Sequence, residues 1–276
     1  MSSKSLTVPE LEALSRKIRA DILRSIYEAG SGHPGGSLSS VDILLSLFFN
    51  EMRHNPKDPK WNSRDRFILS KGHAVPALYA VLSECGYLPE GTLSKLRLFD
   101  SCLQGHPDAN RTPGVEVSSG SLGNGLSIST GIAAAARLDK KNIRIFCLLG
   151  DGECDEGLVW EAAMLAPHLK LDNLTAIVDR NRLQIDGCTE AVVRLEPLPD
   201  KWRAFNWNVL EVNGHSYPQL FDSYRKAREC KGKPTVIVAN TVKGKGVSFM
   251  ENVAEFHGKP PNKEQLDRAL KELEVY

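Results

Sequence analysis

Residues 143–178 read IRIFCLLGDGECDEGLVWEAAMLAPHLKLDNLTAIV, and they indicate the fold more clearly than any other part of the sequence. The apolar run 143–149 is typical of a buried strand, and the Gly-Asp-Gly that follows it marks a tight turn. Residues 157–169 have the pattern of a helix, and residues 174–178 predict a second buried strand. A strand, a helix and a strand in this order indicate a parallel βαβ unit.

The flanking sequence extends this pattern. Thr7 and Glu10 predict a capping box for a helix that ends near Gly30. Further helices are expected at 41–49, after a glycine-rich turn, and at 74–84. A long loop at 103–125 leads into an alanine-rich helix. Two more strands are expected at 208–212 and 234–242, with a helix at 217–231 between them. Alternating strands and helices predict an α/β fold, a doubly wound, mostly parallel sheet with helices on both faces, and residues 1–276 as a single domain.

Composition narrows the class of protein. Of the 276 residues, 41% are hydrophobic and 25% charged, with 35 basic and 34 acidic side chains. This balance gives no electrostatic reason to expect a nucleic acid or a membrane as partner. The amino terminus lacks the features of a signal peptide, and no apolar run approaches the ~20 residues of a membrane span. The six cysteines stand far apart, so we expect reduced thiols and a cytoplasmic protein.

Two polar residues follow the two strands of the βαβ unit. Asp151 comes directly after the first strand, and Asn181 follows the second about thirty residues later. Parallel strands end at the same edge of a sheet, so a carboxylate, an amide oxygen and a nearby backbone carbonyl can converge there. Hard oxygen ligands of this kind suit Mg²⁺, with phosphate and water completing the octahedron. Gly-Asp-Gly alone would be read as a simple turn, but the spacing to Asn181 favours a metal site.

With these residues in place, the sequence resembles a known family. GDGECDEGLVWEA and VDRNRLQIDG resemble the thiamine-diphosphate motif, in which an asparagine follows GDG after about thirty residues. SGHPGGSLS, SKGHA, QGHPD, SGSLGNG and FHGKP resemble successive active-site segments of transketolases, in the same order. The match covers nearly the whole chain. It implies the diphosphate-binding domain of a transketolase, here as the amino-terminal subunit of a split enzyme.

The resemblance implies a role for each matching residue. Asp151, Asn181 and the backbone oxygen of Leu183 would bind Mg²⁺. The thiamine diphosphate would be contacted by His73, Gly120, Ser121, Leu122, Asp151, Gly152, Glu156, Asn181 and His257. The catalytic histidines would be His33, His106 and His257, which contact the substrate and help proton transfers. Glu156 and Glu161 are candidates for polar coupling between paired active sites.

Other candidate residues have simpler explanations. His54, His168 and His215 lie outside the family segments, so we expect structural hydrogen bonds for them. Lys243 and Lys245 resemble a phosphate grip, but a solvated loop explains them equally well. The apolar residues 44–49 are more simply core or subunit interface than a substrate pocket.

The implied activity is the transfer of a two-carbon ketol unit from a ketose phosphate to an aldose phosphate, as in the pentose phosphate pathway. Thiamine diphosphate supplies the electron sink for the carbanion left by C–C cleavage. In transketolases a second domain holds the aminopyrimidine of the cofactor, and this sequence ends at Tyr276 without one. We therefore expect the partner to be a carboxy-terminal transketolase subunit, in an α₂β₂ heterotetramer.

Alternatives to this activity remain open. The chain could serve another thiamine enzyme, of the 2-oxo acid dehydrogenase or deoxyxylulose phosphate synthase type, or it could be non-catalytic and only bind a partner. The four histidine-bearing segments favour transketolase. Many transketolases have proline where Ser121 stands, and GHPGG replaces a bulkier sequence after the first histidine, which leaves the sugar preference open.

Overall fold

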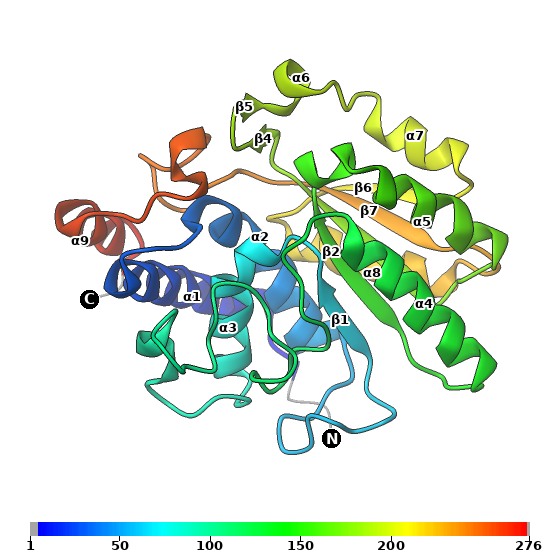
Figure 1. Cartoon of the computed structure of the whole chain (residues 1–276), viewed down its shortest axis with the longest axis horizontal. Helices are drawn as coiled ribbons and strands as arrows, with labels where there is room; N and C mark the ends of the chain where they lie inside the picture. The colour runs from blue at the N-terminus through cyan, green and yellow to red at the C-terminus, as the bar shows by residue number, and fades with distance from the viewer. Residues whose placement is uncertain (1–4, 275–276) are drawn as a thin grey trace.

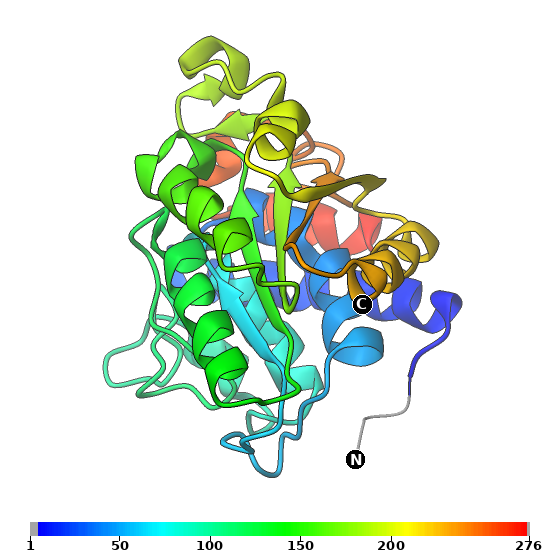
Figure 2. The same cartoon turned by 90° about the vertical axis from the view of Figure 1, so that its right-hand side faces the viewer.

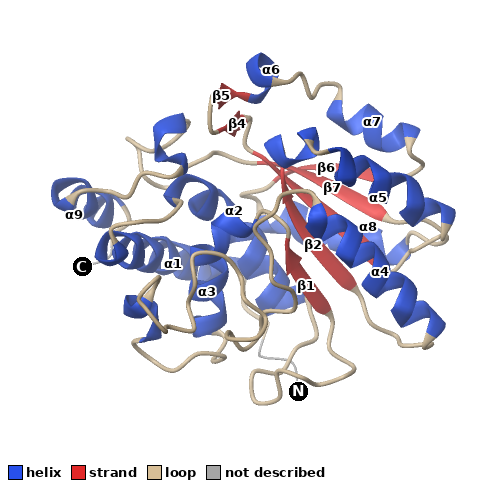
Figure 3. Cartoon of the chain, viewed as in Figure 1, coloured by secondary structure: helices blue, strands red, loops and turns tan. Residues whose placement is uncertain are grey.

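A computed structural model of the chain describes residues 5–274 (Figure 1). Its centre is a five-stranded sheet in the order β1-β2-β3-β7-β6, in which all neighbours are parallel, and a small antiparallel hairpin, β4–β5, stands apart from it (Figure 3). The strands are β1 (Arg66–Leu69), β2 (Ile145–Gly150), β3 (Leu174–Arg180), β4 (Leu183–Gln184), β5 (Gly187–Cys188), β6 (Asn208–Asn213) and β7 (Thr235–Asn240).

Helices cover both faces of the sheet (Figure 2). They are α1 (Val8–Ala29), α2 (Pro34–Ser46), α3 (Val75–Glu84), α4 (Asn124–Leu138), α5 (Gly157–His168), α6 (Thr189–Val192), α7 (Leu198–Ala204), α8 (Tyr217–Glu229) and α9 (Lys263–Glu272). One face is covered by α2, α3 and α8, with α1 packed against α2 and α3, and the other by α4, α5 and α7, so each face has its own apolar core. The predicted doubly wound α/β fold is confirmed.

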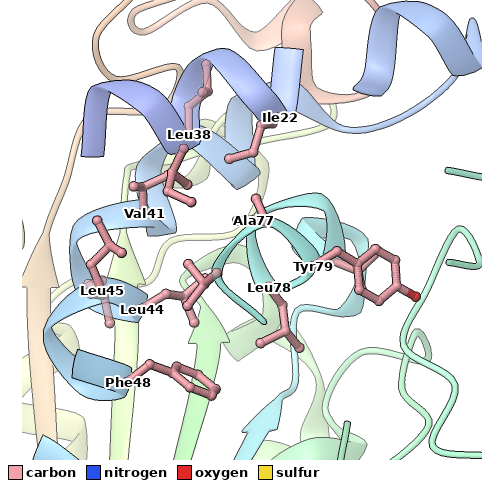
Figure 4. Close-up of a cluster of buried hydrophobic side chains, with 14 of the residues drawn as sticks. Ile22, Leu38, Val41, Leu44, Leu45, Phe48, Ala77, Leu78 and Tyr79 are labelled. Carbon is pink, nitrogen blue, oxygen red and sulfur yellow. The ribbon is translucent and has the colours of Figure 1, made fainter. Parts of the chain in front are cut away.

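The larger core surrounds α2 and α3 (Figure 4). Leu44, Phe48 and Leu78 are almost completely buried there, and burial of one such side chain contributes about 1.5–3 kcal/mol. The apolar residues 44–49 belong to this core and do not line the large cavity described below, as expected. The last of them begin a short π-helical turn, Leu47–Glu51, which ends this segment.

The amino-terminal helix forms as the sequence predicts. The Glu10 carboxylate accepts hydrogen bonds from the backbone N–H and the hydroxyl of Thr7, both at 2.7 Å. Gly30 ends α1 with φ 60°, a left-handed conformation that glycine adopts without steric cost.

The second helix begins seven residues earlier than the predicted residue 41, at Pro34. Proline is pre-organised for a first helical turn. The glycines after it are selected by close contacts: a Cβ at Gly35 would lie 3.0 Å from the Phe256 carbonyl oxygen, and one at Gly36 would lie 3.2 Å from His73 Nε2. The sequence interpretation of this stretch as a turn was wrong, because tertiary packing overrides the low helix propensity of glycine.

Several short elements were not predicted: β1, the β4–β5 hairpin, α7 and α9. Predicted boundaries also move by a few residues. β2 spans Ile145–Gly150 rather than 143–149, and β7 spans Thr235–Asn240 rather than 234–242. The predicted loop at 103–125 is observed, but it ends at Gly123, because α4 begins at Asn124.

The strand order places three strand ends side by side. Gly150 at the end of β2 pairs with Asp179 of β3, and Asp179 pairs with Ala239 of β7. The chain proceeds from β1 to β3 across the sheet, then crosses to β6 and returns to β7, so its direction reverses between β3 and β7. Ligands of doubly wound sheets bind at such a reversal, outside the carboxyl ends of the strands.

Candidate cofactor site at the carboxyl edge of the sheet

A cavity of 230 Å³ lies at this edge. Its walls come from α2, the turn after β1, the loop before α4, the ends of β2 and β3, the β4–β5 hairpin and the segment after β7. The lining residues are His33, Gly36, Lys71, His73, Gly120, Leu122, Gly150, Asp151, Gly152, Glu153, Asn181, Leu183, Gln184, Ile185, Lys243 and His257. Segments from near both ends of the sequence therefore meet in one place.

The predicted oxygen set lies together in the cavity. The buried Asp151 carboxylate accepts hydrogen bonds from the Gly152 N–H at 2.8 Å, the Arg182 N–H at 2.5 Å and Arg180 Nη1 at 3.1 Å. Burial, followed by the charge of Asp179, raises the pKa of Asp151. Among residues 5–274 no three His, Cys, Asp or Glu side chains form a metal cluster, so a cation here would rely on one carboxylate, amide and carbonyl oxygens, and the ligand's own oxygens.

Lys243 points into this oxygen set. Its Nζ donates to the Leu183 carbonyl oxygen at 3.0 Å and lies 2.9 Å from His257 Nδ1. The side chain is 2% exposed, so the interpretation of Lys243 as part of a solvated loop was wrong. Burial and the nearby Lys71 lower the pKa of Lys243 to about 8. A buried ammonium of this kind gains strongly from an anionic ligand.

The floor of the cavity is a buried ion pair. Lys71 Nζ lies 2.5 Å from Asp179 Oδ2 and also donates to the Gly36 carbonyl oxygen at 3.0 Å. Asp179 accepts further hydrogen bonds from Ser39 and Thr241. Burial favours the neutral acid, but Lys71 and these donors prevail and lower the pKa of Asp179. The Lys71 ammonium can therefore lie at the cavity wall while Asp179 balances its buried charge.

Three histidines surround the opening above this floor. The His73 and His257 rings stack with centroids 4.9 Å apart, and the His33 ring lies 5.4 Å from His73 and 5.5 Å from His257. Burial is the main cause of their low pKa values, about 4 for His33, about 3 for His257 and well below the usual value for His73. All three are neutral at pH 7 and can accept or donate a hydrogen bond.

Glu153 holds the glycine-rich loop in place. Its carboxylate accepts hydrogen bonds from the Gly123 N–H and the Gly150 N–H, both at 2.9 Å, and from the Ser70 hydroxyl. Three segments are thus tied to one buried side chain, which brings Gly120 and Leu122 to the cavity wall. No local sequence pattern indicated this role.

Some predicted residues lie outside the cavity. Ser121 and Glu156 are exposed and do not line it, and Glu161 is exposed on α5. His106 is exposed at its rim, with its ring centroid 6.3 Å from that of His33. Lys245 lies outside and pairs with Glu251 at 3.3 Å.

Sequence reasoning missed several lining residues: Gly36, Lys71, Glu153, Gln184 and Ile185. For Lys71 a signal existed, because it precedes His73 by two residues within SKGHA. Ile185 lies at the cavity mouth with 69% of its surface exposed, and no sequence pattern indicated that it would line the cavity.

The remaining histidines differ among themselves. His54 is buried and contacts the Tyr87 hydroxyl at 3.0 Å and the Phe48 carbonyl oxygen at 2.7 Å. His215 Nδ1 lies 2.7 Å from Asp42 Oδ2. Both have the structural hydrogen bonds that we expected. His168, in contrast, is exposed at the end of α5, so its ring can hydrogen-bond to water and needs no partner within the protein.

Fold and cavity together define an α/β protein with a site for an anionic ligand at a topological reversal of the sheet. Comparison with known proteins identifies the family to which this protein belongs. The family model described as the thiamine diphosphate binding domain of transketolase matches residues 12–275, and the chain belongs to this family. It is 44% identical over 268 residues to one of the subunits of apulose-4-phosphate transketolase from Phocaeicola vulgatus, covering 97% of this chain and 95% of that protein.

Two further relatives extend the comparison. The chain is 43% identical over 265 residues to a 6-deoxy-6-sulfo-D-fructose transketolase subunit of a Clostridium species, covering 96% of each. The crystal structure of Campylobacter jejuni transketolase superposes with a TM-score of 0.93 at 33% identity over 98% of this chain. The chain spans 43% of the length of that transketolase. Within residues 5–274, no helix has the length and apolar character needed to cross a membrane.

Proposed function

We propose that the chain is the diphosphate-binding subunit of a split transketolase, which transfers a two-carbon ketol unit with thiamine diphosphate and Mg²⁺. The observation that carries the proposal is the combination, in one cavity, of the Asp151, Asn181 and Leu183 oxygens with buried cations. Residues 1–276 would act as one domain, since both apolar cores pack on the same sheet.

The residues present fit this cofactor. Asp151, Asn181 and the Leu183 carbonyl would hold the metal, and Lys71, Lys243 and the histidines would face the diphosphate. Lys243 now donates to the Leu183 carbonyl oxygen, so we expect it to exchange that oxygen for a phosphate oxygen when the metal binds. The cofactor supplies the electron sink for cleavage of the ketose C–C bond.

The histidines would handle the substrate. His33 and His257 are neutral at physiological pH, because burial lowers their pKa values to about 4 and about 3. A neutral imidazole accepts a proton from a sugar hydroxyl or hydrogen-bonds a carbonyl oxygen, depending on its tautomer. His106, at the rim, would contact a substrate hydroxyl rather than the diphosphate.

The names of the relatives bear on the substrate. One is named for apulose 4-phosphate and another for 6-deoxy-6-sulfo-D-fructose, so the sugars in these names carry a phosphate or a sulfonate. We propose a sugar with an anionic end group as donor, and ribose-type sugar phosphates are one choice among several.

A partner subunit follows from two observations. Relatives that this chain matches over nearly their whole length are named as subunits. Neighbouring helices α4 and α5 also expose Leu138, Met164 and Leu165, with 83%, 64% and 48% of their surfaces accessible. Exposed apolar side chains of this size mark association surfaces when they lie close together. We propose an α₂β₂ assembly in which each active site contains residues of a second chain with a pyrimidine-binding domain.

The test is to assay ketol transfer by the purified chain, alone and with the protein that co-purifies with it. We expect no turnover by the chain alone and turnover by the pair. Pyruvate decarboxylation by the pair would instead favour another thiamine enzyme. Absence of thiamine diphosphate and Mg²⁺ binding by the pair, measured by calorimetry, would favour a non-catalytic role.

A further inference from the structure

The loop around Arg97 has an unusual backbone. Arg97 and Asp100 both have φ 59°, a left-handed conformation that non-glycine residues rarely adopt. The Arg97 N–H donates to the Leu103 carbonyl oxygen at 2.8 Å and closes the loop. Leu98 and Phe99 at its tip are exposed, with 52% and 102% of their surfaces accessible, while the Arg97 side chain turns inward. Strain of this kind persists where surrounding contacts over-determine it.

The Arg97 guanidinium joins two segments that are far apart in the sequence. Nη1 donates to Ser31 Oγ at 3.0 Å, and Nη2 donates to the Gly105 carbonyl oxygen at 3.4 Å. Ser31 stands two residues before His33, and Gly105 directly precedes His106. A Cβ at Gly105 would lie 2.9 Å from Arg97 Cζ, so glycine makes room for the guanidinium.

The other supports of these segments do not connect them. The Tyr79 hydroxyl donates to the His106 carbonyl oxygen at 3.2 Å and fixes that segment to α3. In Figure 4 this hydroxyl points away from the apolar cluster that holds the helix. His33 Nδ1 is buried without a hydrogen-bond partner among residues 5–274, so no bond from this atom fixes the ring. Arg97, in contrast, has hydrogen bonds to both histidine-bearing segments.

We propose that Arg97 is a positioning residue that sets the placement of His33 relative to His106 at the rim of the cofactor cavity. This inference rests on the proposed function and assigns to the transketolase site a group that touches neither the cofactor floor nor the metal oxygens. A planar fork with fixed donors suits this task better than a flexible ammonium.

The charge of Arg97 has a second effect. After burial, it is the largest cause that lowers the pKa of both His33 and His106. The other groups facing His33 are Lys243, the His106 ring, and the neutral rings of His73 and His257. These groups are cationic or neutral, so they do not offset the guanidinium. Arg97 therefore adds to burial in lowering the pKa of both imidazoles, which favours the neutral form that can accept a proton.

The experiment compares Arg97→Gln and Arg97→Lys with Arg111→Gln. Arg111 is an exposed arginine near the same loop that pairs with Asp100 at 3.3 Å, which makes it a matched control. Gln and Lys, like Arg, are non-glycine residues, so both variants carry the same conformational strain at the positive φ of position 97. Three quantities are measured: imidazole titration of the full chain by NMR, cofactor affinity by calorimetry, and ketol transfer by the chain with its partner.

In Arg97→Gln we expect the pKa values of His33 and His106 to rise and kcat to fall roughly 100-fold, the loss that a misplacement of about 1 Å can cause. Cofactor affinity should change less than about two-fold, and Arg97→Lys should restore the pKa values but only part of kcat, because it keeps the charge and loses the fork. Arg111→Gln should match wild type in all three.

Two results would overturn the inference. The first is an unchanged histidine titration in Arg97→Gln together with a higher KM that is seen only for phosphorylated or sulfonated substrates. Arg97 would then bind the anionic group of the substrate, with its buried Nε, which has no hydrogen-bond partner among residues 5–274, as the donor. Wild-type kcat in Arg97→Gln would exclude a positioning role. If the wild-type pair shows no ketol transfer while the titration shifts still appear in Arg97→Gln, the proposed function fails and the arginine–histidine coupling stands.

Discussion

The floor and the rim of the cofactor cavity are built in different ways. The floor consists of buried groups at the ends of β1, β2, β3 and β7, among them Asp151 and the Lys71–Asp179 ion pair. Its central carboxylate, Asp179, receives hydrogen bonds from Lys71, Ser39 and Thr241. The rim consists of loops, and there His106 is exposed. The difference indicates that the floor should control cofactor affinity and the stability of the fold, whereas the rim should control turnover. The following predictions test this division.

The largest effect is expected at the floor from Asp151→Ala. The substitution removes the carboxylate of the proposed metal site, and loss of outer-shell partners alone typically costs 10- to 100-fold in metal affinity. We expect metal-dependent binding of thiamine diphosphate to fall by more than about 100-fold in calorimetry. Circular dichroism should show an intact fold. Wild-type affinity would remove Asp151 from the metal site.

A second prediction concerns the buried ion pair. Asp179→Asn leaves the Lys71 ammonium without its counter-charge, and breaking a buried pair from one side typically costs about 3–5 kcal/mol. The free energy of unfolding in urea should fall by that amount. The double variant Asp179→Asn with Lys71→Met should regain much of the stability and bind the cofactor poorly. If the single variant is as stable as wild type, the pair does not support the floor.

The third prediction separates two histidines. His106→Ala should reduce kcat of the assembled pair by about 100-fold, within the range of general acid–base catalysis, with little change in cofactor affinity. His73→Ala should weaken cofactor binding by roughly 3- to 10-fold, the value of one hydrogen bond of about 0.5–1.5 kcal/mol. Equal cofactor affinity in both variants and wild type would contradict the division of roles between His73, just above the floor, and His106 at the rim.

The smallest effect is a pH dependence of stability. The pKa of His33 in the fold, about 4, lies below the ordinary value of 6.5, so the unfolded chain binds more protons between these pH values. Its contribution to the free energy of unfolding should be complete above pH 6.5 and be lost as the pH falls towards 4. Burial raises the pKa of Asp151, which acts in the opposite direction.

Urea unfolding of wild type and His33→Asn at several pH values isolates this contribution, because the carboxylates are common to both proteins. The difference between the two curves should change with pH between 6.5 and 4. A constant difference would show that the His33 pKa is not lowered in the fold.

Local patterns in the sequence determined the main elements. The apolar run before Gly150 and the apolar run before Asp179 predicted adjacent parallel strands, because such strands are buried on both faces and their signal is continuous. The position of Asp151 and Asn181 at one edge followed from that topology. Each of these inferences depends on residues close together in the chain or on one crossover.

Other features depend on contacts between segments that are far apart in the sequence. Lys243 is a cavity residue, and Gly35 and Gly36 belong to a helix, because segments from opposite ends of the chain pack against each other there. Glu153 and Arg97 join segments that no local pattern relates. Hydrogen bonds and burial across such distances depend on how the whole chain folds, and the periodicity of a short window carries no information about them.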